Sequence, residues 1–168
     1  MRSEENRTFA PSAKGFGGIF TILLQRMAQE EDLTFRHQMP IQIRFNDVDR
    51  YGHVNNNAYF SYYDLGKVDY LSSVLNLYAG TPDVVPVIAN INADFFQPVF
   101  YGDDIVVETC VPHVGTKSFT LVQRAVNRRT GAEVCRCRTV MVCFSLSQQA
   151  SVEVPEDYRA AILAYERL

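Results

Sequence analysis

The stretch that decides the fold reads Arg44-Phe45-Asn46-Asp47-Val48-Asp49-Arg50-Tyr51-Gly52-His53-Val54-Asn55-Asn56-Asn57. It joins the end of an alternating strand pattern to a glycine turn and to asparagines that can cap a helix. A structural turn needs only the glycine and the cap. The further polar groups, Asp47, Asp49 and His53, therefore indicate that chemistry takes place where a strand becomes a helix.

The residues on either side of this turn predict a strand and a buried helix. Residues Pro40 to Phe45 alternate, which predicts a half-buried strand with Ile41, Ile43 and Phe45 on one face. Residues Ala58 to Leu75 contain no proline, and their apolar side chains lie nearly all round a helical cylinder. Such a helix is buried on most sides, by a wrapped sheet or by a subunit interface. Gly66 at its midpoint permits a close backbone approach.

The remaining sequence is mostly of the β type. Apolar alternation and Gly or Pro turns predict strands at Val87 to Val99, Ile105 to Val114, Lys117 to Asn127 and Ala132 to Leu146, followed by a helix from Val154 to Leu168. This order predicts an α+β fold in which one curved antiparallel sheet wraps around one long central helix. We expect residues 39–148 to form this domain, and residues 149–168 to form a C-terminal helical tail.

Residues 1–38 are expected to form an N-terminal extension that is partly disordered, with a short helix over Ile19 to Glu31. The apolar stretch from Phe16 to Leu24 is followed by Gln25-Arg26-Met27 rather than by a cleavage site, so export is not expected. No apolar run reaches the ~18–20 residues that a membrane span requires.

Composition narrows the class of protein. The 168 residues suffice for one domain, and the net charge of −3 does not favour nucleic-acid binding. The four cysteines lack the spacing of a metal site and are typical of buried thiols in a reducing compartment. We therefore expect a cytoplasmic protein without a metal or other cofactor.

The motif also carries a family resemblance. Residues Asp47 to Asn56 resemble the Asp-x-Asp-x-x-Gly-x-Val signature of hotdog-fold thioesterases of the 4-hydroxybenzoyl-CoA thioesterase type. The segment Phe95-Phe96-Gln97-Pro98-Val99-Phe100-Tyr101-Gly102-Asp103 and the triplet Lys117-Ser118-Phe119 are similar to two later strands of that family. The resemblance covers residues 40–160.

The resemblance implies a single hotdog domain that hydrolyses an acyl-CoA thioester. It implies a homodimer or homotetramer, with active sites at an interface where two sheets pair edge to edge. By position, Asp49 is the catalytic carboxylate and the backbone N–H near Asn56 polarises the carbonyl, with His53 and Asp64 in secondary roles. Expected substrate contacts are Tyr59, Tyr63, Lys117, Ser118 and Arg128, although the tyrosines also suit the core, and Lys117, Arg124, Arg128 and Arg129 also suit a solvated surface.

The residues agree with this chemistry. Thioester hydrolysis needs a carboxylate that attacks the carbonyl or activates water, together with donors for the oxyanion. The first turn of a helix supplies unpaired N–H groups and a positive dipole end.

Two other functions stay open. Gly52-His53-Val54-Asn55-Asn56 also resembles a run in plant acyl-ACP thioesterases, and the domain could bind acyl thioesters without hydrolysing them.

Overall fold

The structure, a computed structural model, describes residues 33–77 and 80–168. The helix expected over residues 19–31 lies outside this range. The described elements are strand β1 (His37–Ile41), the 3-10 turn η1 (Phe45–Asp47), helix α2 (Asn56–Leu75), strands β2 (Val84–Phe95), β3 (Ile105–Val114), β4 (Ser118–Asn127), β5 (Glu133–Ser145) and β6 (Ala150–Ser151), and helix α3 (Glu156–Glu166).

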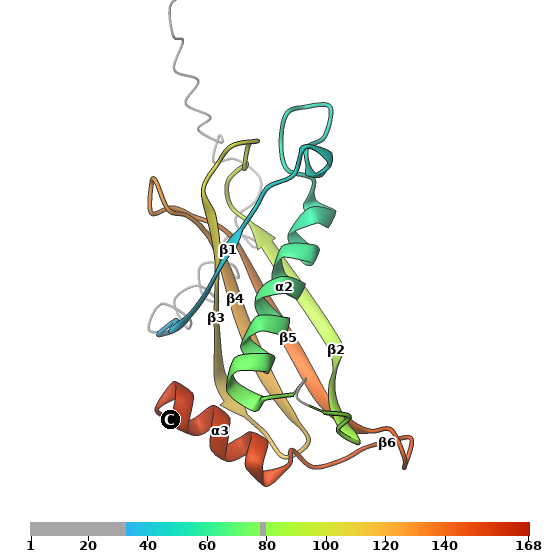
Figure 1. The fold of residues 1–168 in the computed structure, drawn as a ribbon. Helices are drawn as coiled ribbons and strands as arrows, with labels where there is room; N and C mark the ends of the chain where they lie inside the picture. Colours follow the sequence, from blue (N-terminus) through green and yellow to red (C-terminus); the bar gives the residue numbers. More distant parts are fainter. Residues whose placement is uncertain (1–32, 78–79) are drawn as a thin grey trace, which may run out of the picture. The chain divides into compact units, whose positions relative to one another are not determined.

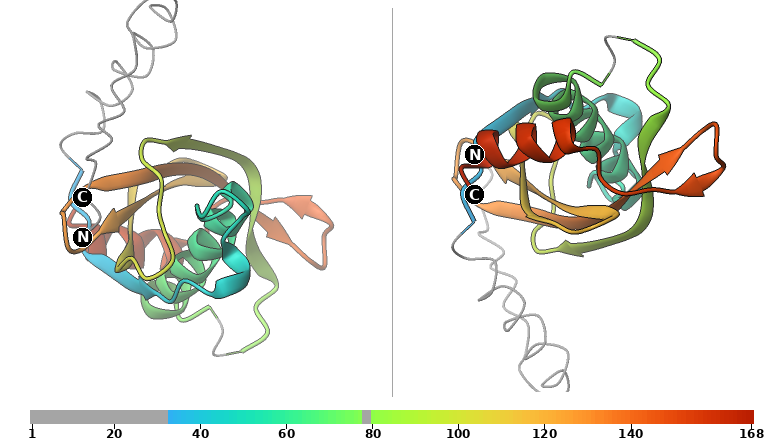
Figure 2. Two further views of the ribbon diagram at one scale, coloured as in Figure 1. Left: turned by 90° about the horizontal axis from the view of Figure 1, so that it is seen from above. Right: turned by 90° about the horizontal axis from the view of Figure 1, so that it is seen from below.

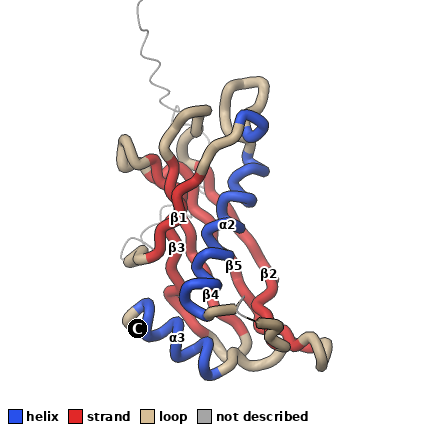
Figure 3. Tube along the Cα trace, viewed as in Figure 1, coloured by secondary structure: helices blue, strands red, loops and turns tan. Residues whose placement is uncertain are grey.

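The strands form one antiparallel sheet in the order β1-β3-β4-β5-β2, with β6 paired to the end of β5. The sheet curves around α2 (Figures 1 and 2), which confirms the expected α+β arrangement. The loop with the motif joins β1 to the N-terminus of α2 at one end of the sheet, whereas α3 lies at the other end (Figure 3). None of the described helices is long and apolar enough to cross a membrane.

Two apolar clusters fill the space between α2 and the sheet. The cluster at the motif end includes Tyr59, Tyr62 and Tyr63 of α2, and the cluster at the other end joins Tyr70 to α3 through Ile162. All four cysteines are buried and none forms a disulfide bond, as the sequence predicts. Burial raises the pKa of the thiols of Cys135, to about 12, and of Cys137, to about 11, so both stay protonated at neutral pH.

Helix α2 approaches the sheet most closely at Gly66. A Cβ atom there would lie 2.7 Å from Cγ1 of Val107 and 3.0 Å from Nε2 of Gln123. The Gln123 amide donates to the carbonyl of Tyr63 at 2.9 Å and so ties the helix backbone to β4. The expected role of Gly66 is confirmed, because a side chain would push the helix off the sheet.

A buried glutamate fastens α3 to the rest of the domain. A register shift in β3 lies between Cys110 and His113, and the N–H of Val111 within it donates to Oε1 of Glu166 at 2.9 Å. The hydroxyl of Tyr70 donates to the same oxygen at 2.7 Å. The C-terminal helix is thereby bonded to α2 and β3.

One detail of the predicted strand is wrong. The strand ends at Ile41, and Phe45 lies in a 3-10 turn with 81% of its surface exposed, because the chain has already left the sheet.

The sheet covers one side of helix α2, whereas Phe60, Leu65 and Val68 are 38%, 47% and 44% exposed in the single chain. The second explanation for its apolar surface, a subunit interface, stays a prediction.

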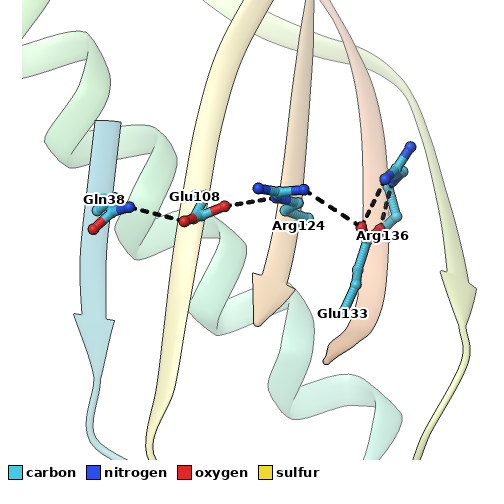
Figure 4. Close-up of polar contacts among 5 residues, drawn as sticks. All are labelled: Gln38, Glu108, Arg124, Glu133 and Arg136. Atoms are coloured by element: carbon cyan, nitrogen blue, oxygen red, sulfur yellow. Dashed lines mark hydrogen bonds and ion pairs between the residues drawn. The ribbon is translucent and has the colours of Figure 1, made fainter. Parts of the chain in front are cut away.

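Polar side chains form a connected row across the sheet (Figure 4). Gln38 donates to Glu108 at 2.8 Å, and Arg124 donates from Nε to Oε2 of Glu108 at 2.6 Å. Arg124 also lies 3.9 Å from Glu133, which accepts two hydrogen bonds from Arg136. The row joins β1, β3, β4 and β5 by ion pairs and hydrogen bonds, and it engages the charge of Arg124 within the fold.

Replacing Gly66 with alanine tests the close approach. We expect Gly66→Ala to lower the free energy of unfolding by roughly 1–3 kcal/mol, because the new methyl group overpacks the site against Val107. Gly80→Ala is the control, since nothing lies within 4 Å of a Cβ there. Urea denaturation of both variants measures the difference, and equal stability of the two would contradict the proposed overpacking.

Candidate active site

The motif forms a tight hairpin between β1 and α2. The N–H of Asp49 donates to the carbonyl of His53 at 2.8 Å, and the N–H of Gly52 donates back to the carbonyl of Asp49 at 3.0 Å. Gly52 has a φ of +82°, a conformation that glycine adopts without strain. Val54 donates to the carbonyl of Val99, which joins the hairpin to the segment after β2.

The two motif aspartates have different surroundings. Asp47 accepts from the N–H of Arg44 and from the hydroxyl of Tyr62, both at 2.7 Å and both through Oδ2, and so links the turn to helix α2. Asp49 accepts through Oδ1 from the N–H groups of Tyr51, at 2.8 Å, and His53, at 3.3 Å. Within the described residues, Oδ2 of Asp49 has no hydrogen-bond partner and is available to a substrate or a water molecule.

Helix α2 begins at the end of this hairpin. Asn55 is its N-cap, and its side chain accepts from the N–H of Asn57 at 2.9 Å. The N–H of Asn56 donates to no acceptor among the residues that the structure describes. The unpaired N–H at a helix start is a donor for a developing negative charge, as the sequence analysis expects of Asn56.

A pocket opens beside the helix start. It has a volume of about 240 Å³, and its lining residues are His53, Val54, Asn56, Tyr59, Phe95, Phe96, Gln97 and Pro98. The rings of Tyr59 and Phe95 meet edge to face at 5.2 Å, and those of His53 and Phe100 do so at 5.1 Å. Tyr59, Phe95 and Phe96 therefore give the pocket an aromatic part, and Asn56 is also a lining residue. Asp49 is not a lining residue, although the same hairpin carries it.

The structure brings several expected site residues to one end of the domain. Asp49, His53, Asn56 and Tyr59 lie on the hairpin or the first turn of α2. Arg128 follows β4 at this end, where its side chain is 56% exposed and lies 3.9 Å from Asp104. Arg128 therefore provides one exposed basic group at the hairpin end of the domain, in a long ion pair with Asp104.

Other expected site residues lie apart from this end. Lys117 and Ser118 are at the opposite end of β4, a ten-residue strand that spans roughly 30 Å. Lys117 donates to the carbonyl of Ser151. Asp64 is exposed and pairs with Lys67 at 2.5 Å, and Tyr63 is 2% exposed and does not line the pocket. A single protomer therefore does not assemble the whole set.

No pattern in the sequence assigned a lining role to Phe95, Phe96, Gln97 and Pro98, or a partner to Tyr62. The four lining residues belong to a segment that carries part of the family resemblance, and that resemblance is the signal in the sequence that could have pointed to them. The chain after β2 runs back to the motif and so brings these residues to the hairpin, and local periodicity does not predict such a contact.

Within residues 33–77 and 80–168, no group of three or more His, Cys, Asp or Glu side chains is placed to hold a metal ion.

Solved structures show the same architecture, which defines a hotdog fold. The PA5185 protein of Pseudomonas aeruginosa is 27% identical with a TM-score of 0.70, over 77% of this chain and 91% of that one. A thioesterase of Thermus thermophilus, complexed with coenzyme A and Zn, is 25% identical with a TM-score of 0.70, over 80% of this chain and 96% of that one.

A 4-hydroxybenzoyl CoA thioesterase mutant complexed with 4-hydroxybenzoyl CoA shares the fold at 23% identity and a TM-score of 0.67, over 74% of this chain and 96% of that one. The family model of the Thioesterase-like superfamily matches residues 43–162, and the chain belongs to this superfamily. Membership supports thioester hydrolysis as its class of reaction. Among curated proteins, YsmA of Bacillus subtilis is 26% identical over 93 residues, which are 55% of this chain and 63% of YsmA.

The N-cap of α2 can be tested on its own. We expect Asn55→Ala to lower the free energy of unfolding by about 1 kcal/mol, because the N–H of Asn57 loses its acceptor. Asn57→Ala is the control, since only the backbone of Asn57 takes part in the cap. Thermal unfolding of both variants compares the two, and an Asn55→Ala variant as stable as the control would show that this cap contributes nothing.

Proposed function

We propose that this protein hydrolyses an acyl-CoA thioester to the free acid and CoA. Asp49 acts as the base or the nucleophile, and the N–H of Asn56 polarises the thioester carbonyl. The observation that carries the proposal is the pair of unused groups on one hairpin, namely Oδ2 of Asp49 and the N–H of Asn56, beside an aromatic pocket. These are the two components that thioester hydrolysis requires.

The groups support either of two routes. As a base, Asp49 takes a proton from water while the water oxygen bonds to the thioester carbon. As a nucleophile, its carboxylate oxygen bonds to that carbon and forms an anhydride, which water then cleaves. In both routes the carbonyl oxygen becomes an oxyanion beside Asn56, the C–S bond breaks, and the thiolate of CoA leaves and is protonated by solvent. The free N–H and the helix dipole stabilise the oxyanion by ~3 kcal/mol per donor.

The CoA part of the proposal rests on the relatives and on exposed basic groups. The Thermus thermophilus thioesterase was solved with coenzyme A, and 4-hydroxybenzoyl CoA thioesterase was solved with its acyl-CoA. Arg128 is exposed at the hairpin end and suits a phosphate of CoA. Arg124 does not, because Glu108 and Glu133 already surround its guanidinium group.

A second copy of the chain completes the site in this proposal. Strand β2 is a 12-residue edge of the sheet, and an open edge of this length invites a further strand. The exposed apolar side chains of β2 and of α2 together form what we call the edge stripe, and the two elements meet where the ring of Phe95 contacts that of Tyr59 at 5.2 Å. The edge stripe consists of Ile88, Ile91 and Phe95 of β2 with Phe60, Leu65 and Val68 of α2.

If the β2 strands of two copies pair antiparallel, opposite ends of the two strands lie side by side. The Phe95 end of one β2 then lies beside the Val84 end of the other, which is the end of the sheet where β4 begins. Lys117 and Ser118 of the second copy thereby approach the hairpin with Asp49. This arrangement explains how residues roughly 30 Å apart in one protomer serve one substrate. Further assembly of dimers into a tetramer is compatible with it.

The proposal includes the domain limits and the location. Residues 39–148 form the catalytic domain and residues 149–168 its helical tail in this proposal. Because strand β1 begins at His37, residues 37 and 38 of the expected extension 1–38 belong to the sheet, and the matched family region is 43–162. A cytoplasmic location suits four buried cysteines that form no disulfide bond, because a reducing compartment keeps thiols reduced.

The role of Asp49 is tested by Asp49→Asn. We expect kcat/KM toward acyl-CoAs to fall at least about 100-fold, because the amide keeps an oxygen for the N–H groups of Tyr51 and His53 but is neither a base nor a nucleophile. The assay is thiol release from acyl-CoAs of graded length and from aromatic acyl-CoAs. Asp157→Asn, on the exposed first turn of α3, is the control for loss of one charge.

Three outcomes would contradict the proposal. An Asp49→Asn variant with wild-type activity would remove this mechanism. Release of thiol from acyl-ACP but not from the matching acyl-CoA would identify a carrier-protein thioesterase. Binding of acyl-CoA by the wild type without any hydrolysis would identify a non-catalytic module.

The edge stripe is tested by Ile91→Glu. We expect this variant to be monomeric and to lose hydrolysis, because a charge at the centre of the β2 edge opposes pairing of two copies. Light scattering coupled to size exclusion measures the mass, and thiol release measures the activity. Leu146→Glu, at another exposed apolar residue that lies outside the stripe, controls for the added charge. A dimeric and active Ile91→Glu variant would exclude this interface.

A further inference from the structure

The hydrogen bond between Tyr62 and Asp47 connects the catalytic hairpin to the body of α2. The hydroxyl of Tyr62, in the second turn of the helix, donates to Oδ2 of Asp47 at 2.7 Å. The same oxygen accepts the N–H of Arg44, at 2.7 Å, and the backbone carbonyl of Asp47 accepts the N–H of Asn55, also at 2.7 Å. Asp47 therefore bonds to three segments at once, namely the chain leaving β1, the helix cap and the helix interior.

Of these contacts, the bond from Tyr62 is the one that reaches the packed core. Tyr62 is 4% exposed and belongs to the apolar cluster at the motif end, whereas Arg44, Asp47 and Asn55 lie on the partly or fully exposed hairpin. Burial, and next the Asp47 carboxylate, raise the pKa of Tyr62, so the hydroxyl stays protonated and remains a donor. The hairpin is thus bonded to the core by a hydrogen bond whose donor stays protonated at neutral pH.

Asp49 and Asn56 lie on the two sides of this attachment point in the sequence. Asp49 is two residues beyond Asp47, and Asn56 follows the Asn55 cap that Asp47 holds. A change in the position of Asp47 therefore changes the separation between the free carboxylate oxygen and the free N–H. A displacement of 1 Å in such a pair is enough to cost on the order of 100-fold in rate.

We propose that Tyr62 is a positioning residue for hydrolysis, which acts through Asp47 to set the distance between the Asp49 carboxylate and the Asn56 amide. The kinetic part of this inference rests on the proposed function. Tyr62 touches neither group and does not line the pocket. Loss of its hydroxyl therefore affects the rate of the chemical step and leaves substrate binding nearly unchanged.

Helix α2 contains a matched control for this bond. Tyr70 is 0% exposed and donates at 2.7 Å to the carboxylate of Glu166, so it has the same kind of hydrogen bond as Tyr62. It lies eight residues further along the helix, about 12 Å from Tyr62. Tyr62→Phe and Tyr70→Phe each remove one buried hydroxyl from one carboxylate. Only the first touches the hairpin.

We expect Tyr62→Phe to lower kcat at least about tenfold with KM within about twofold of the wild type, since a fraction of an ångström is lost in alignment. Tyr70→Phe is expected to keep the wild-type kcat, although its Tm falls as much as that of Tyr62→Phe. If both variants lose activity in proportion to Tm, Tyr62 is only structural and the inference is wrong. A wild-type kcat in Tyr62→Phe also overturns it.

A double-mutant cycle identifies the path of the effect. If Tyr62 acts through Asp47, the double variant Tyr62→Phe/Asp47→Ala, which lacks the acceptor of the Tyr62 hydroxyl, loses no more kcat than Asp47→Ala alone. Losses that multiply would show two independent effects and would contradict the inference.

Amide hydrogen exchange gives a readout that does not need turnover. We expect the amide of Asn55, which donates to the carbonyl of Asp47, to exchange at least about tenfold faster in Tyr62→Phe and at the wild-type rate in Tyr70→Phe. Unchanged exchange in Tyr62→Phe would overturn the positioning role. If exchange changes as expected but the wild type hydrolyses no thioester, the proposed function fails while the attachment of the hairpin stands.

Discussion

The structure depends on the close contact between α2 and the sheet at Gly66. Because no side chain intervenes there, the helix lies near enough to β3 and β4 for the amide of Gln123 to bond to the carbonyl of Tyr63. This contact divides the core into a cluster at the motif end and a cluster at the α3 end. It also holds α2 against the sheet, and the position of the helix determines where its N-terminus, with the free N–H of Asn56, meets the hairpin.

The same packing leaves one side of the domain open. The sheet covers the tyrosine side of α2, whereas the side chains of the edge stripe stay 38–47% exposed in the single chain. An exposed apolar edge is unfavourable in water, and in the proposed dimer a second copy covers it. The same proposed pairing would bring Lys117 and Ser118, at the far end of β4, toward the hairpin of the other copy, so that one interface would cover the stripe and complete the site.

Local patterns in the sequence predict the elements well and the contacts between them poorly. Strand β3 has the predicted limits, because alternation and flanking turns define it, and the Thioesterase-like relationship confirms the fold. The exposure of Phe45 could not be predicted, since alternation continues after the chain leaves the sheet. The pocket wall at Phe95 and the hydrogen bond from Tyr62 to Asp47 each join segments that are separated along the chain. Local patterns in a single sequence predict neither contact.

The two motif aspartates show why residue type alone does not assign a role. Both are aspartates of one hairpin, two residues apart, and a carboxylate at either position could in principle activate water. Oδ2 of Asp47 already accepts from Tyr62 and from the backbone, so a substrate would have to displace bonds that hold the helix start. Asp49 satisfies its turn through Oδ1 alone, which leaves Oδ2 available at no cost to the fold. The hydrogen bonds therefore support the proposed division of the pair, in which Asp47 holds the turn and Asp49 is the carboxylate free to react.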